Sequence, residues 1–157
     1  MKKIAAIIEA RMTSRRLPGK VLLKSKGMTM LEILISRLKK VKLIDQIIIA
    51  TTNSRFDDVL ENEASRLGVS CFRGSEHDVL DRVLSAARFY KSDIIVEITG
   101  DCPLIDPDIV SIVLNSYFHN TCDYASNCLI PSYPDGMEVQ VFSADILAHS
   151  SELAVTQ

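Results

Sequence analysis

The sequence has few cysteines, and none is placed as a disulfide framework or a zinc ribbon requires. The four are Cys71, Cys102, Cys122 and Cys128; they form no C-x-x-C pair, and no secretory leader precedes them. This spacing disfavours disulfide scaffolds and structural zinc sites. We therefore expect a protein of the reducing cytoplasm.

Long apolar runs and an excess of positive charge are also absent. No stretch reaches the roughly 18 apolar residues of a membrane-spanning helix, and the apolar run from Ile4 to Ile8 is too short for a signal sequence. The formal net charge is −2, so the chain as a whole has no cationic field that would hold nucleic acid. We expect a soluble protein without nucleic-acid or membrane partners, in which local charge holds any bound anion.

The chain does contain short apolar runs that alternate with amphipathic helical patterns. Its 157 residues are 47% hydrophobic, which is enough for one substantial core, and we expect a single domain over residues 1–157. The strand candidates are Ile4 to Ile8, Ile47 to Thr51, Val69 to Phe72 and Ile94 to Ile98. Their alternation with helices predicts an α/β domain with a mostly parallel sheet, whose ligand site lies beyond the carboxyl ends of the strands.

Start and stop signals place the expected helices between these strands. Thr29 and Glu32 form a capping box ahead of apolar residues at helical spacing, and Gly68 is typical of a helix end. Three further helices are expected from about Asp57 to Leu67, from about Asp78 to Tyr90, and after Asp106-Pro107. Beyond Tyr124 we expect turns around Pro131 and Pro134 to Gly136, a strand from Met137 to Phe142, and a helical stretch to Gln157.

A basic loop follows the first strand candidate. Six cations and no acidic residue lie between Glu9 and Glu32. Pro18 fixes one φ angle and Gly19 permits a positive φ, which suits a rigid loop folded over an anion. The loop is not a Walker motif, because Ser14 stands where that motif needs glycine. Polyphosphate is a natural counter-charge for such a loop, and a solvated basic turn is the alternative.

A carboxylate stands at the end of the fourth strand candidate. Asp101 follows Gly100 at the expected carboxyl edge of the sheet, where it could ligate Mg²⁺ bridging phosphates on the basic loop. The alternative is that Asp101 makes a turn or caps the next helix. Asp106 fits the capping role better, because Pro107 would occupy the first helical position after it.

Three segments in the same order match one enzyme family. They are an Ala-Arg-x-x-Ser-x-Arg-Leu-Pro-Gly-Lys signature at Ala10 to Lys20, a pair of runs at Phe72 to Ser75 and Asp78 to Arg82, and a Gly-Asp-Cys-Pro-Leu-Ile-Asp-Pro run at Gly100 to Pro107. With them the chain resembles the acylneuraminate cytidylyltransferase family from about Ile4 to Phe142. It is most similar to the spore-coat polysaccharide group, a relative of the ketodeoxyoctonate cytidylyltransferases.

This resemblance implies a three-layer, Rossmann-like fold of the nucleotide-diphospho-sugar transferase type. It also implies that the protein forms a homodimer. It implies Mg²⁺-dependent transfer of CMP from CTP to an acidic, sialic-acid-like or related sugar, with pyrophosphate release, in surface polysaccharide or glycan biosynthesis. The implied catalytic residues are Arg11, Lys20 and Asp101, with Asp101 as metal ligand. The implied nucleotide contacts are Arg11, Ser14, Arg16, Gly19, Lys20, Arg73, Gly74, Ser75 and Arg82. Asp135 and Glu138 would contact the acceptor sugar.

Other interpretations stay open at this point. The segment after Ser75 is also consistent with an ordinary packed helix that Ser75 or Asp78 caps. In that interpretation, Arg82 lies on a solvated face of the helix. Asp135 and Glu138 also read as a turn leading into a strand. The activity itself could be another nucleotidyl transfer on the same fold, with a different base or acceptor, or no catalysis at all in a nucleotide-binding or assembly module.

The end of the chain gives one more expectation. Family members carry a further Asp near their C-terminus, in a Val-Asp-Thr-type segment that completes the metal site, and nothing after Phe142 matches it. We therefore expect a C-terminally truncated family domain that binds CTP but turns over slowly or not at all. The last stretch is apolar, which favours a partner surface or self-association; its apolar residues are Ile146, Leu147, Leu153, Ala154 and Val155.

Overall fold

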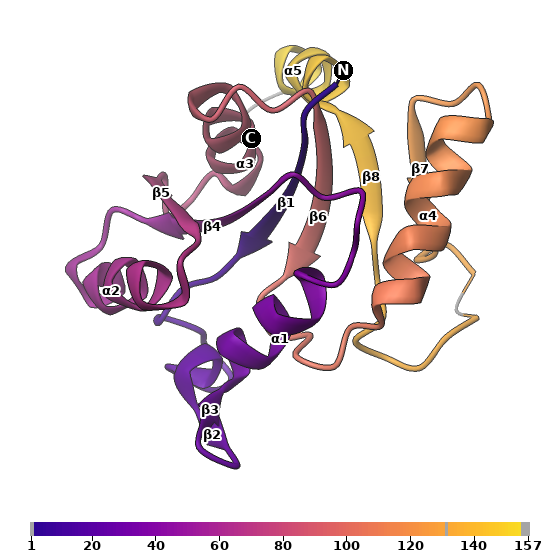
Figure 1. Ribbon diagram of the computed structural model, residues 1–157. Coiled ribbons are helices and arrows are strands. Elements are labelled where there is room, and N and C mark those ends of the chain that lie inside the picture. The colour runs from indigo at the N-terminus through magenta and orange to yellow at the C-terminus, as the bar shows by residue number, and fades with distance from the viewer. Residues whose placement is uncertain (1, 131, 155–157) are drawn as a thin grey trace.

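The core of the fold is a six-stranded sheet in the order β5-β4-β1-β6-β8-β7, seen in Figure 1. The computed structural model describes residues 2–130 and 132–154. The strands are β1 Ile4–Glu9, β4 Gln46–Thr52, β5 Ser70–Gly74, β6 Ile94–Thr99, β7 Tyr124–Ser126 and β8 Gln140–Ser143. β5, β4, β1 and β6 are parallel, whereas β8 runs antiparallel to β6 and β7 antiparallel to β8. This confirms the predicted α/β domain with a mostly parallel sheet.

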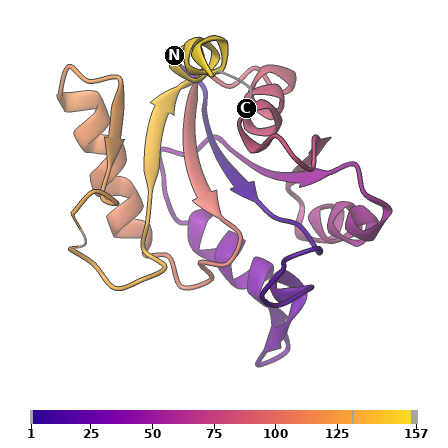
Figure 2. The ribbon, with the colours of Figure 1, turned by 180° about the vertical axis from the view of Figure 1, so that it is seen from behind.

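Helices cover both faces of this sheet (Figures 1 and 2). They are α1 Met30–Leu38, α2 Asp58–Leu67, α3 Val79–Phe89, α4 Pro107–His119 and α5 Ala144–Leu153. Alternate strand residues face opposite ways: Ile8 and its equivalents pack with α1, α2 and α4, whereas Ile7 and its equivalents pack with α3 and α5. Two buried clusters on the two faces make the three layers that the resemblance implied.

Short elements complete the connection from β1 to α1 and the one from β4 to α2. They are η1 Lys20–Leu22, the two-stranded ribbon of β2 Lys24–Ser25 and β3 Met28–Thr29, and η2 Arg55–Asp57. In the described part of the chain, no helix combines the length and apolar character needed to cross a membrane.

The predicted helix signals act as expected. The Thr29 hydroxyl accepts a hydrogen bond from the Glu32 amide at 3.0 Å, and Gly68 ends α2 in the left-handed conformation. Asp106 caps α4 ahead of Pro107. Asp78, rather than Ser75, is the N-cap of α3. The expected helix to Gln157 ends at Leu153 within the described part, and residues 155–157 and the turn at Pro131 lie outside it.

One strand begins later than the sequence suggests. The expected strand from Met137 starts only at Gln140, because the Asn127 side chain occupies the backbone groups just before it. Its amide nitrogen donates to the Met137 carbonyl at 2.8 Å, and its oxygen accepts from the Val139 amide at 2.8 Å. Asn127 thereby takes the place of a neighbouring strand for this segment.

The end of β6 lies unusually close to the end of β1. The Gly100 amide donates to the Glu9 carbonyl at 2.8 Å, and a β-carbon added at Gly100 would lie 2.7 Å from that oxygen. Only glycine fits this approach without displacing backbone. The contact places Asp101 directly beside the loop that follows β1.

Candidate active site

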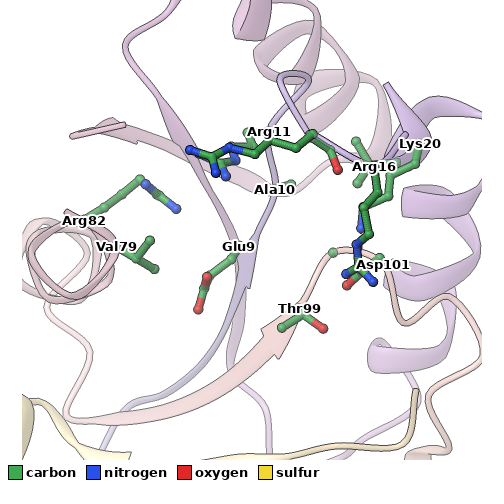
Figure 3. Close-up of a pocket in the computed structure, with 13 residues that line it drawn as sticks. Glu9, Ala10, Arg11, Arg16, Lys20, Val79, Arg82, Thr99 and Asp101 are labelled. Atoms are coloured by element: carbon green, nitrogen blue, oxygen red, sulfur yellow. The ribbon is translucent and has the colours of Figure 1, made fainter. Parts of the chain in front are cut away.

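A pocket of about 320 Å³ lies at the carboxyl ends of β1 and β6, between the basic loop and the start of α3 (Figure 3). Such an edge of parallel strands is where α/β sheets bind ligands. The pocket therefore coincides with the place that the sequence predicts for a site. Its lining is Glu9, Ala10, Arg11, Ser14, Arg15, Arg16, Lys20, Val21, Val79, Arg82, Thr99, Gly100 and Asp101.

The basic loop is held in one shape by bonds across its base. The Gly19 amide donates to the Met12 carbonyl at 2.9 Å, and Gly19 has φ of 69°, in the left-handed region that the sequence predicted. The Met12 amide in turn donates to a carboxylate oxygen of Asp57 at 2.7 Å. The loop is thus closed on itself and fastened to the segment after β4.

Asp57 is the anchor of this arrangement, and sequence reasoning missed its role. Its side chain is fully buried, and it also accepts hydrogen bonds from the amide (3.2 Å) and the hydroxyl of Thr52 at the end of β4. The sequence predicts Asp57 only as the first residue of a helix, and Asp57 does end η2 just before α2. The only signal for more was an acidic residue close after a strand end, which is too common a pattern to single it out.

Lys20 and Asp101 form an ion pair at one side of the pocket. The hydrogen bond from the Lys20 ammonium is the main reason that the pKa of Asp101 lies below its ordinary value. Asp101 does not cap α4, because Asp106 fills that role, so the capping part of the alternative is wrong, whereas Asp101 does lie in a turn after β6. Its carboxylate instead lies among the cations of the basic loop.

Arg82 lines the opposite side of the pocket from within α3. Its side chain is only 3% exposed, so the expectation of a solvated face is wrong. One guanidinium nitrogen donates to the Ser75 carbonyl at 2.5 Å, and Nε has no hydrogen-bond partner among the described residues. Burial lowers the pKa of Arg82, which the charge of Glu9 partly offsets. Gly74 makes room for it, since an added β-carbon there would lie 3.0 Å from the Arg82 Cγ atom.

The structure brings together part of the predicted nucleotide-contact set. Arg11, Ser14, Arg16, Lys20 and Arg82 line the pocket, together with the predicted metal ligand Asp101, whereas Gly19, Arg73, Gly74 and Ser75 do not. The guanidinium of Arg73 donates to the carbonyls of Thr52 and Ser54 and pairs with Asp58 and Glu61. A direct contact between Arg73 and a nucleotide therefore stays a prediction.

A second pocket, of about 620 Å³, adjoins the first and contains the predicted acceptor residues. Asp135 and Glu138 line it, and it shares Arg16, Thr99 and Asp101 with the first pocket. Glu138 accepts a hydrogen bond from the Gly136 amide at 2.8 Å, which fixes the turn before β8. The two pockets thus meet at Arg16 and Asp101.

A pair of glutamates, also missed from the sequence, lies at the first pocket, with Glu9 in the lining and Glu97 outside it. Glu97 of β6 is opposite Ile7 and Glu9 of β1 is opposite Thr99, so the two glutamates are diagonal neighbours on one face of the sheet. Burial, together with the carboxylate of Glu9, raises the pKa of Glu97 to about 8. At neutral pH, therefore, Glu97 favours its protonated form.

This shift predicts a pH-dependent effect of Glu97→Gln on stability. The folded protein keeps the proton of Glu97 up to a pKa of about 8, whereas the unfolded chain releases it near 4.5, so stability falls as the pH rises between these values. Glutamine removes that loss. We expect the free energy of unfolding of the variant, relative to that of the parent, to increase by on the order of 2 kcal/mol from pH 5 to pH 8. Urea unfolding at both pH values measures this change. Glu152→Gln, whose parent side chain is exposed on α5, is the control, and an equal difference at both pH values would contradict the assignment.

The acidic residues also bear on metal binding. Within residues 2–130 and 132–154, no group of three or more histidine, cysteine, aspartate or glutamate side chains could enclose a metal ion. Mg²⁺, however, is commonly held by one or two carboxylates together with substrate phosphates and water. Asp101, a hard oxygen donor in the same pocket lining as Arg16 and Lys20, fits that kind of site.

Comparisons with known proteins agree with this geometry. A family model described as cytidylyltransferase matches residues 5–151. The spore coat polysaccharide biosynthesis protein SpsF of Bacillus subtilis is 35% identical over 157 residues, covering 98% of this chain and 64% of that protein. A 3-deoxy-manno-octulosonate cytidylyltransferase of Trichlorobacter lovleyi is 33% identical over 119 residues, covering 75% of this chain and 46% of that protein.

A solved structure of a cytidylyltransferase is also similar to this chain. The structure of a cytidylyltransferase from Leptospira borgpetersenii superposes with a TM-score of 0.95 at 36% identity, over 99% of this chain and 66% of that one. The chain thus spans less than two thirds of the length of these curated relatives. The acylneuraminate part of the expected resemblance stays a prediction. Because the family model covers nearly all of the chain, from residue 5 to residue 151, the chain belongs to the cytidylyltransferase family.

Proposed function

We propose that this domain binds CTP with Mg²⁺ in the first pocket and transfers CMP to an acidic sugar in the second, releasing pyrophosphate. The observation that carries the proposal is the meeting of Arg11, Lys20 and Asp101 around one pocket at the carboxyl edge of parallel strands. Cations supply counter-charge for a triphosphate, and a carboxylate beside them supplies a ligand for its metal. The names of the relatives support cytidylyl transfer to sugars of surface polysaccharides.

The basic loop would hold the triphosphate through several contacts at once. Arg11 and Arg16 offer planar forks of donors, Lys20 a point charge and Ser14 a hydroxyl, and all four line the pocket. Lys20 is paired with Asp101 in the structure, so metal binding to Asp101 would free the ammonium for phosphate oxygens. Bound Mg²⁺ would stabilise the negative charge that builds up on the phosphates during transfer.

The chemistry then requires positioning more than reactive side chains. The anomeric hydroxyl oxygen of the sugar attacks the α-phosphorus of CTP, the bond to the pyrophosphate oxygen breaks in line, and the hydroxyl proton leaves to solvent. Arg11 and Lys20 would neutralise the departing charge. Arg16 lines both pockets, so it can orient the carboxylate of the acceptor against the α-phosphate.

Two measurements together test the proposal. Thermal unfolding with each nucleoside triphosphate, with and without Mg²⁺, should show the largest stabilisation with CTP and Mg²⁺, because a specific ligand raises stability by mass action. Pyrophosphate release with CTP and candidate sugar acids tests transfer directly. Preference for another base would favour a different nucleotidyl transfer. Binding of CTP without pyrophosphate release for any acceptor would favour a non-catalytic module.

Asp101→Asn is expected to abolish the Mg²⁺ dependence of CTP binding while leaving the fold intact. The amide is neutral and a poorer ligand for a hard cation. Calorimetric titration with CTP, with and without Mg²⁺, measures the effect, and circular dichroism checks the fold. Asp106→Asn, which retains a capping oxygen at the start of α4, is the matched control. Unaltered Mg²⁺ dependence in Asp101→Asn would exclude Asp101 as the metal ligand.

A further inference from the structure

The first pocket has two chemically different ends. Lys20, Arg16 and Asp101 lie at one end, and Glu9, Val79 and Arg82 lie at the other, toward which the guanidinium of Arg11 also points, as Figure 3 shows. A nucleotide whose triphosphate lies on the basic loop has its base at the far end of the pocket. Glu9 and Arg82 would then face the base, and neither is needed for holding phosphates.

Glu9 presents a hydrogen-bond acceptor to this end of the pocket. It lines the pocket, whereas Glu97 lies behind it on the same face of the sheet. Burial, together with the neighbouring carboxylate of Glu9, raises the pKa of Glu97 to about 8, so Glu97 favours its protonated form at neutral pH. An ionised carboxylate has lone pairs and no proton, so it can accept hydrogen bonds but cannot donate them.

Arg82 presents the opposite chemistry. Its guanidinium is almost completely buried, it lines the same end of the pocket, and its Nε group has no hydrogen-bond partner among the described residues. A buried donor without a partner is costly, and a ligand that accepts its hydrogen bond removes that cost. The two side chains thus offer one acceptor and one donor from neighbouring elements, β1 and α3.

This combination matches cytosine and opposes uracil. Cytosine carries an amino donor at position 4 beside acceptors at N3 and O2, and a carboxylate is a natural partner for that amino group. Uracil instead carries a carbonyl oxygen at position 4 and an N–H at position 3. The uracil O4 atom and the carboxylate are both hydrogen-bond acceptors, so neither could donate a hydrogen bond to the other.

We propose that Glu9 determines base specificity by accepting a hydrogen bond from the 4-amino group of cytosine, while Arg82 donates to the acceptor atoms of the same ring. The inference rests on the proposed function, since it assumes that the pocket binds a nucleoside triphosphate. It goes further by naming the residue that separates CTP from UTP. Sites that hydrogen-bond a polar group of the substrate reject analogues without it strongly, because buried partners are then left unpaired.

The test compares dissociation constants for CTP and UTP, measured by calorimetry with Mg²⁺, in the parent, Glu9→Gln and the control Glu152→Gln. The parent and the control should prefer CTP. Glu9→Gln should reduce the CTP-to-UTP preference at least tenfold, because the amide can turn its NH₂ group toward O4 of uracil. An unchanged preference in Glu9→Gln, including an equal fall in affinity for both nucleotides, would overturn the role of Glu9.

A second probe isolates the amino group. The triphosphate of 2-pyrimidinone riboside lacks the 4-amino group, so it should bind the parent at least tenfold more weakly than CTP and bind Glu9→Ala nearly as well as CTP does. A penalty of equal size in both proteins would overturn the inference. These outcomes differ from those expected if the proposed function is wrong. In that case the parent would bind no triphosphate or would prefer a purine nucleotide.

Discussion

Asp57→Ala is expected to destabilise the protein by about 3 to 5 kcal/mol, the largest effect of any single substitution considered for this chain. The carboxylate is fully buried and accepts hydrogen bonds from the Met12 amide and from the amide and hydroxyl of Thr52. Alanine leaves the two donors of Thr52 buried and the half-buried Met12 amide without a partner, and two of the three are backbone groups that no rotamer change can redirect. Urea unfolding of parent and variant at neutral pH measures the difference.

The neighbouring residue supplies the control for this variant. Asp58 is largely exposed and forms an ion pair with Arg73, so Asp58→Ala should cost no more than about 1 kcal/mol. If Asp57→Ala also lost less than about 1 kcal/mol, Asp57 would not be the anchor of the loop. Below its unfolding transition, Asp57→Ala should further bind CTP more weakly than Asp58→Ala, because the loop has lost its fixed attachment at Met12.

Lys20→Ala and Arg11→Ala are each expected to weaken CTP binding by about 1.5 to 3 kcal/mol, which is roughly 10- to 150-fold. Each variant loses a charge-assisted contact to phosphate oxygens. Lys20→Ala also leaves the Asp101 carboxylate without its cation, so repulsion between that carboxylate and the triphosphate adds to the loss when Mg²⁺ is absent. Calorimetric titration with CTP, with and without Mg²⁺, measures both contributions.

Lys24→Ala is the matched control for these two variants. Lys24 belongs to the same cationic stretch but lies in β2, is exposed and does not line the pocket. It tests whether overall charge, rather than position, governs binding. Affinities like that of the parent for Lys20→Ala and Arg11→Ala, or an equally large loss for Lys24→Ala, would show that the loop does not bind the triphosphate at these residues.

Local patterns in the sequence were sufficient for much of the fold and part of the site. The strands from Ile4, Ile47 and Ile94 were predicted because continuous apolar runs between helical patterns are typical of buried parallel strands. The positive φ at Gly19 and the cap at Asp106 followed from residue chemistry alone. Such features depend on neighbours within a few residues, so a single sequence contains the information for them.

The remaining parts of the site depend on residues that are distant in the sequence. Asp57 reaches Met12 across 45 positions, and Glu9 meets Glu97 only because β1 and β6 are adjacent in the sheet. Arg82 illustrates the same limit, since its position on a helix did not reveal that the helix turns it inward, where it is 3% exposed. A periodic pattern gives the apolar face of a helix, but a long side chain at the border of that face can point either way.

The sequence by itself therefore determined the order of the elements, the parallel sheet and the cationic loop after its first strand, because periodicity, capping and charge are properties of adjacent residues. Only the tertiary structure decided which of those charges share a pocket. Strand order brings the ends of β1 and β6 together, and the close approach at Gly100 places Asp101 against Lys20. Burial between the same strands also raises the pKa of Glu97, since the energy of a charge depends on the surroundings that packing creates.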